Sequence, residues 1–171
     1  QLSNKSIYAL KEKWGKTEWW RLIVNKGTSS VENLIGKDVH ESSRAEFEEY
    51  RISQEVPAYP NELSPQVNPL EANLIDLVSF TKGCYVGQEV IARLDTYNKV
   101  QKHLCGFKLT EVPQSVPAPI IRGQEEVGTV TSAVYSTSVG SVVGLGFLRM
   151  DALEPATSPL LAEGKIKLEL R

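Results

Sequence analysis

Short apolar runs and polar connections alternate along the first hundred residues. Residues 18–24 are rich in strand formers and predict a β-strand that ends in a turn. Apolar positions three and four apart predict a short helix over residues 31–36. Ser43 and Glu46 have the spacing of a capping box, which predicts a helix over residues 43–53. A strand followed by helices indicates an α+β segment.

Prolines and then helix formers dominate the next stretch. Four prolines fall within residues 55–69, so this stretch is predicted to be an ordered loop or a linker. Residues 70–80 are mostly apolar and are expected to hold a short buried helix. Helix-forming residues dominate from Gly87 to Leu94, with apolar side chains on one face, and predict a further helix.

Further along, the pattern changes to a period of two. Residues 127–135 and 142–148 are rich in strand formers, and the last residues alternate strictly between apolar and charged side chains. Several short strands at close spacing predict a small antiparallel β-barrel over residues 101–171. The boundary is predicted to fall within residues 98–103, so that residues 1–100 form a separate α+β domain.

Candidate chemistry gathers in the signature segment, residues 82–89, which reads Lys82-Gly83-Cys84-Tyr85-Val86-Gly87-Gln88-Glu89. Cys84 lies just before the helix predicted from Gly87. A helix start and the ammonium of Lys82 both favour a thiolate, the reactive form of cysteine. The two glycines allow unusual backbone conformations, and the Gln88–Glu89 pair adds polar groups that could orient a reactant. A buried structural cysteine is the alternative that the residues alone leave open.

The signature segment resembles that of the YgfZ family in the glycine-cleavage T-protein superfamily, and of its mitochondrial relative in iron–sulfur cluster maturation. The similarity covers about residues 40–150 and includes Tyr50-Arg51-Ile52, Pro69-Leu70-Glu71, Ala92-Arg93 and the barrel segment 127–132. One departure is that Ser53, Gln54 and Glu55 stand where the family usually has an acidic residue and a glycine.

The resemblance implies a tetrahydrofolate cofactor and assistance in assembling or repairing iron–sulfur clusters, on which certain tRNA-modifying enzymes depend. It implies Cys84, Lys82, Gln88 and Glu89 as catalytic groups, Gly83, Tyr85 and Gly87 as the motif backbone, and Arg51, Glu71 and Arg93 as folate contacts. The expected partners are folate and iron–sulfur client or assembly proteins. The N-terminal region that builds much of the family's folate pocket has no counterpart in this sequence, so weak folate binding is expected of the chain alone.

Two other functions stay open. One is a tetrahydrofolate-dependent, aminomethyltransferase-like one-carbon transferase, and the other is a non-catalytic folate-sensing scaffold. Since folate-dependent one-carbon transfer does not require a cysteine, Cys84 favours cluster maturation. Arg51 and Glu71 each have a simpler alternative as an exposed arginine and an exposed loop glutamate.

Composition narrows the classes of function further. The chain has 171 residues, of which 41% are hydrophobic, enough for a buried core. The net charge of −2 gives no broad basic surface for duplex nucleic acid, and no apolar run approaches the length of a membrane span. Cys84 and Cys105 indicate free thiols in a reducing compartment, the cytoplasm or, in a eukaryote, the mitochondrial matrix. With His40 and His103 they lack a zinc-site spacing, so no metal site is expected.

Overall fold

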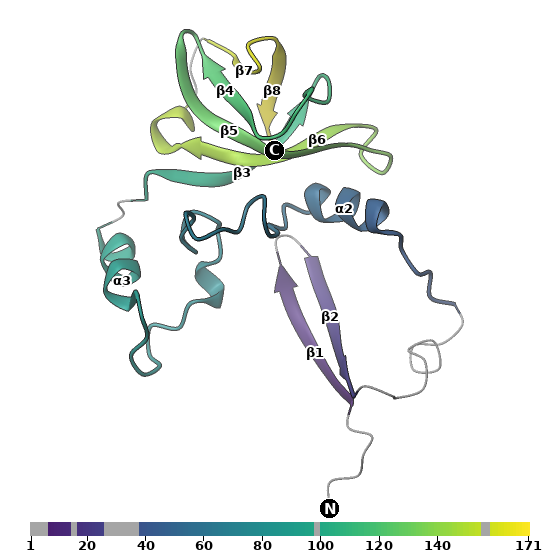
Figure 1. The fold of residues 1–171 in the computed structure, drawn as a ribbon, viewed down its shortest axis with the longest axis vertical. Coiled ribbons are helices and arrows are strands. Elements are labelled where there is room, and N and C mark those ends of the chain that lie inside the picture. The colour runs from purple at the N-terminus through teal and green to yellow at the C-terminus, as the bar shows by residue number, and fades with distance from the viewer. Residues whose placement is uncertain (1–6, 15–16, 26–37, 98–99, 155–157) are drawn as a thin grey trace, which may run out of the picture. The chain divides into compact units, whose positions relative to one another are not determined.

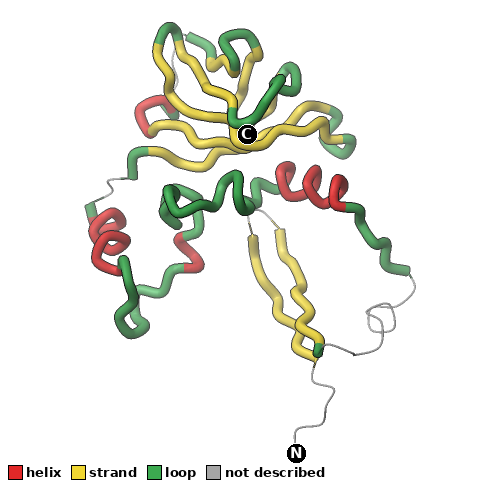
Figure 2. The backbone as a smooth tube through the Cα atoms, in the orientation of Figure 1, coloured by secondary structure: helices red, strands yellow, loops and turns green. Residues whose placement is uncertain are grey.

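The computed structural model describes residues 7–14, 17–25, 38–97, 100–154 and 158–171. The chain divides into two compact units, residues 1–48 and 49–171. Figure 1 labels the elements and Figure 2 colours them by type. Among the described helices, none has the length and apolar character needed to cross a membrane.

An antiparallel hairpin makes up most of the first unit. Its strands are β1 (Ile7–Trp14) and β2 (Thr17–Val24), which pair along their whole length. The strand predicted over residues 18–24 is confirmed, whereas β1 has no matching prediction because charged residues fill its centre. The helix predicted over residues 31–36 lies outside the described residues. The charges of β1 are paired with β2, as Lys11–Glu18 at 2.8 Å and Glu12–Arg21 at 3.0 Å.

The capping box correctly predicts the start of helix α2 (Arg44–Ser53). The Ser43 N–H donates to Glu46 Oε2 at 2.7 Å, and the Glu46 N–H donates to Ser43 Oγ at 3.2 Å. These two bonds satisfy N–H groups that a helix start would otherwise leave unpaired. The bond from the Ser43 backbone N–H to the carboxylate is also the largest cause of the lowered pKa of the Glu46 carboxyl.

Helix α2 ends in a Schellman motif. The Val56 N–H donates to the Arg51 carbonyl at 2.8 Å, and the Glu55 N–H donates to the Ile52 carbonyl at 3.1 Å. Glu55 therefore has a φ of 60°, in the left-handed region that favours glycine. Its carboxylate lies against β3, because a Cβ added at Gly106 would be 2.5 Å from Glu55 Oε1.

The predicted small antiparallel β-barrel is confirmed, and it is closed. Its strands are β3 (Lys102–Leu109), β4 (Ala118–Arg122), β5 (Glu125–Ser136), β6 (Ser141–Arg149), β7 (Leu160–Ala162) and β8 (Ile166–Leu170). They follow the order β3-β6-β5-β4-β7-β8, and β8 pairs with β3 to close the ring. A short 3-10 helix, η2 (Met150–Ala152), follows β6.

Strands β3 and β6 are buried on both faces. Inside the barrel, Phe107 of β3 and Leu148 of β6 belong to the main apolar core. Outside it, Leu104 of β3 packs in a second cluster with Ile52 of α2 and with three residues of β6, which are Val143, Leu145 and Phe147. We call residues 49–74 the docking segment, because they run along the outer side of β3 and β6 (Figure 1).

Glycines allow close contact between β5 and β6 where β5 bulges. The pairing register of β5 shifts between Val130 and Ser132. Opposite this point, a Cβ on Gly146 would lie 2.2 Å from the Thr129 carbonyl oxygen and 2.8 Å from the Val130 Cα. A residue with a side chain at this position would therefore collide with the backbone of β5.

The stretch between α2 and the barrel is ordered but mostly irregular. Leu70 and Ala72 are buried, so the proline-rich part leads into a packed loop rather than a free linker. The helix predicted within residues 70–80 is only the 3-10 turn η1 (Ile75–Leu77), and the prediction of burial is wrong because Ile75 and Leu77 are exposed. Helix α3 (Gln88–Thr96) confirms the next prediction, although none of its residues is buried.

Candidate functional site

Cys84 lies in an exposed loop ahead of helix α3. Gly87 caps this helix with a φ of 89°, a conformation that requires glycine, and no side chain caps the free N–H groups of the first turn. A Cβ on Gly83 or Gly87 would find no atom within 4 Å. The loop is therefore open around its sulfur, and its backbone shape depends on Gly87 more than on packing.

Lys82 and Tyr85 contact each other on either side of Cys84 in the sequence. The Lys82 ammonium lies 4.7 Å from the centre of the Tyr85 ring, within the range of a cation–π interaction. The Tyr85 hydroxyl is buried and has no hydrogen-bond partner in the part of the chain that the structure describes. The Lys82 N–H also donates to Ser79 Oγ at 3.2 Å. The Tyr85 ring thus contacts the Lys82 ammonium, which belongs to a residue two positions before Cys84 in the sequence.

The other predicted polar groups of the site lie on α3. Gln88 is half-buried, and its N–H donates to the Tyr85 carbonyl at 3.2 Å. Glu89 and Arg93 are both exposed. Although they are one turn apart on α3, no ion pair joins them among the described residues. Both side chains remain accessible to a ligand.

Arg51 is almost completely buried, and its guanidinium binds groups of this chain. It donates to Glu62 Oε2 at 3.0 Å, to the Val56 carbonyl at 3.1 Å and to Ser132 Oγ at 3.2 Å. The alternative of an exposed arginine is therefore wrong. Arg51 does hold a carboxylate, but that carboxylate belongs to Glu62.

Glu62 was not singled out by sequence, yet it links the docking segment to β5. It is fully buried and accepts three further hydrogen bonds besides the ion pair, from the Ala58 N–H at 3.1 Å, from Thr131 Oγ1 at 2.7 Å and from Ser132 Oγ at 2.6 Å. Asn61 adds a bond from Nδ2 to Ser132 Oγ at 3.1 Å. A glutamate in a proline-rich loop carries no spacing signal, and its partners on β5 lie about seventy residues away in the sequence.

Glu71, the second expected folate contact, closes a turn of its own segment. Its carboxylate accepts the Asn68 N–H at 3.1 Å, and its N–H donates to Asn68 Oδ1 at 3.0 Å. Its carbonyl accepts the Leu104 N–H at 2.8 Å, which joins the turn to β3. The side chain is half-buried, so the alternative of an exposed loop glutamate is also wrong.

The second thiol, Cys105, has a different environment. It is half-buried in β3 and packs against the barrel core. Burial, with a smaller contribution from the charge of Glu55, raises its pKa from 9.0 to about 11. Within the described ranges, no group of three or more His, Cys, Asp or Glu side chains gathers to hold a metal.

The structure defines a class of protein in which a loop with a cysteine and a helix precede a closed β-barrel. Comparison with known proteins identifies this class. Residues 102–164 match the family model of the glycine cleavage T-protein C-terminal barrel domain. The fold is similar to the glycine cleavage system aminomethyltransferase T from Bartonella henselae, with a TM-score of 0.58 over 71% of this chain and 35% of that chain. Their sequence identity is 20%, so this likeness concerns the fold alone.

The chain is also similar in sequence to a transferase, an aminomethyltransferase and an iron–sulfur cluster assembly factor. A candidate chloroplastic transferase of Arabidopsis thaliana is 31% identical over 88% of this chain and 32% of its own length. The aminomethyltransferase of Aquifex aeolicus is 33% identical over 59% of this chain and 28% of its own. The mitochondrial iron–sulfur cluster assembly factor IBA57 of Mus musculus is 42% identical over 64% of this chain and 31% of its own.

The chain belongs to the glycine cleavage T-protein superfamily, as a C-terminal portion of the aminomethyltransferase and YgfZ type. It spans about a third of the length of the curated relatives it matches.

Proposed function

We propose that this chain is part of a folate-binding, YgfZ-like protein that assists the assembly or repair of iron–sulfur clusters, and through them the tRNA modification that depends on such clusters. The observation that carries the proposal is the exposure of Cys84 in the signature segment, whereas Cys105 is half-buried and its pKa is raised. The identity of 42% to a cluster assembly factor supports it.

In this proposal Cys84 supplies one thiolate to a cluster in transit. A cluster usually takes several cysteine ligands, so client or assembly proteins supply the others. The Lys82 ammonium, held over Tyr85, lies two residues from Cys84 in the sequence, and Gln88 and Glu89 orient the incoming group from the first turn of α3. We place the protein in the reducing cytoplasm or inside an organelle, since two of the relatives are a chloroplastic and a mitochondrial protein.

Tetrahydrofolate does not fit the described residues by themselves. Of the three expected contacts, Arg51 is paired with Glu62 and Glu71 closes the turn with Asn68. Of the three, Arg93 alone is exposed, and one guanidinium does not make a pocket. Folate binding is therefore proposed for the whole protein only.

A second candidate is an aminomethyltransferase-like one-carbon transferase. The barrel-domain match and the similarity to the Aquifex aeolicus aminomethyltransferase favour it. Purified full-length protein should then transfer a methylene group to tetrahydrofolate whether or not Cys84 is present. A folate-sensing scaffold would need neither the transfer nor the thiol.

The test is a pair of cysteine variants in the full-length protein. Cys84→Ala should abolish the activity of iron–sulfur enzymes in cells that carry only this variant. It should change the free energy of unfolding by about 1 kcal/mol or less, because the side chain is exposed. Cys105→Ala is the matched control, and cells carrying it should keep their cluster enzymes. Normal cluster-enzyme activity with Cys84→Ala would refute the proposal.

A further inference from the structure

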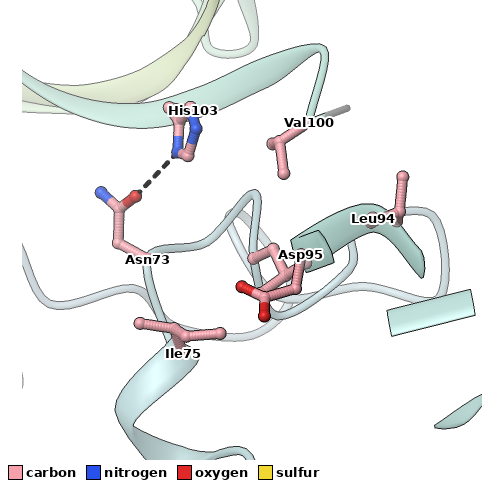
Figure 3. Close-up of a pocket in the computed structure, with 7 residues that line it drawn as sticks. Asn73, Ile75, Leu94, Asp95, Val100 and His103 are labelled. Atoms are coloured by element: carbon pink, nitrogen blue, oxygen red, sulfur yellow. Dashed lines mark hydrogen bonds between the residues drawn. The ribbon is translucent and has the colours of Figure 1, made fainter. Parts of the chain in front are cut away.

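A pocket of about 250 Å³ lies away from the signature segment, beside the start of β3 (Figure 3). Four aliphatic and three polar residues line it, namely Leu70, Ile75, Leu94, Val100, Asn73, Asp95 and His103. They come from the loop around η1, the last turn of α3 and the entry to the barrel. The volume is below that of pockets for drug-sized ligands, so the pocket suits a small group.

Asn73 fixes the orientation of the His103 ring. Its Nδ2 donates to the Leu104 carbonyl at 2.7 Å, which places its amide oxygen toward His103. That oxygen lies 3.1 Å from His103 Nδ1 (Figure 3). Because an amide oxygen only accepts, Nδ1 carries the proton of this bond. In the neutral ring, Nε2 then offers a lone pair.

Asp95 supplies the second acceptor. Figure 3 shows its carboxylate directed into the space that Asn73, Ile75 and His103 surround. Within the described ranges, its side chain makes no hydrogen bond or ion pair. The pocket thus combines an unpaired carboxylate and an imidazole lone pair with aliphatic walls. Both polar groups accept, so a complementary ligand must donate.

We propose that this pocket binds a primary ammonium group on a short aliphatic stem. The Asp95 carboxylate pairs with the charge, His103 Nε2 accepts one N–H, and the stem contacts Leu70 and Ile75. The group belongs either to a free alkylamine or to a lysine side chain of a protein segment. The proposal does not rest on the function proposed for Cys84.

Titrations followed by NMR of the His103 ring test the proposal on the 171-residue chain. At a pH where the ring is neutral, butylammonium should bind with a millimolar Kd, and n-butanol about tenfold more weakly, because it lacks the charge. Nα-acetyl-lysine methylamide distinguishes the two sources, since it should bind at least as well as butylammonium if the natural ligand is a lysine side chain. Equal binding of butylammonium and butanol would overturn the proposal.

Three variants localise the effect. Asp95→Asn should weaken butylammonium binding about tenfold and leave butanol unchanged, and it should fold normally because Asp95 is exposed. Ile75→Trp should fill the pocket and prevent both ligands from binding. Glu111→Gln, which removes an exposed carboxylate outside the pocket, is the matched control. A loss with Glu111→Gln as large as that with Asp95→Asn would mean that net charge, not the pocket, attracts the amine.

Discussion

The docking segment and the signature segment belong to the same compact unit, yet their polar residues have opposite environments. Arg51 and Glu62 of the docking segment are buried and satisfy each other. Cys84 and Glu89 of the signature segment are exposed, and a Cβ at Gly83 would meet nothing within 4 Å. Buried charges must be paired within the protein, whereas exposed groups stay available to other molecules. Substitutions should therefore affect stability in the docking segment and activity in the signature segment.

The largest effect is expected from breaking the buried ion pair. Glu62→Gln keeps the size of the side chain but leaves the Arg51 guanidinium buried without its counter-charge. We expect the free energy of unfolding to fall by about 3–5 kcal/mol. Hydrogen exchange of the β3 and β6 amides in urea measures it directly.

A double variant is the control for this prediction. Arg51→Met with Glu62→Leu removes both charges together, so it should recover part of the stability that Glu62→Gln loses. A loss below about 1 kcal/mol for Glu62→Gln would show that the pair does not hold the docking segment on the barrel.

The same comparison explains what the sequence predicts well. The start of α2 follows from Ser43 and Glu46, because a capping box is a local contact. Strand β8 follows from alternation, since a period of two directly reflects an inside and an outside face, whereas β5 and β6 follow from their content of strand formers. The Arg51–Glu62 pair could not be predicted from spacing, because burial decides the role of Arg51 and depends on β5, far along the chain. The exposure of Ile75 and Leu77 contradicts their apolar pattern, which by itself predicts burial.

The two thiols should differ in alkylation rate by about a hundredfold or more. Raising the pKa of Cys105 from 9.0 to about 11 reduces its thiolate fraction at pH 8 about a hundredfold, and burial slows the reagent further. Cys84 is exposed. Mass spectrometry after timed treatment with iodoacetamide measures both rates.

The pH dependence of this reaction gives a second check. Labelling of Cys105 should keep rising up to about pH 11, since the thiolate fraction grows tenfold with each pH unit below the pKa. Glu55→Gln should lower that pKa by removing the second cause of the shift, and should speed labelling at pH 8. Faster labelling of Cys105 than of Cys84 at pH 8 would reverse the assignment of the reactive thiol.

A matched pair of glycine substitutions compares packing at the barrel with packing at the signature segment. Gly146→Ala should destabilise the barrel by about 1–3 kcal/mol, because its Cβ would collide with the backbone of β5. Gly83→Ala should change stability by less than about 0.5 kcal/mol, because its Cβ meets nothing. Urea unfolding followed by circular dichroism measures both. A similar cost at the two positions would mean that the signature segment is packed as tightly as the barrel.

The smallest effect concerns Glu55, at the end of α2. A left-handed φ of 60° costs a residue with a Cβ about 1–2 kcal/mol relative to glycine. Glu55→Gly removes this cost but also removes the contact of the carboxylate with β3 at Gly106. Glu55→Ala removes the same contact and keeps the backbone cost. The difference in unfolding free energy between the two variants therefore isolates the backbone term, and Glu55→Gly should be more stable than Glu55→Ala by about 1 kcal/mol. Equal stabilities would mean that residue 55 leaves the left-handed conformation once the carboxylate is gone. The contact of the Glu55 carboxylate with β3, and not the Schellman motif, would then set the end of the helix.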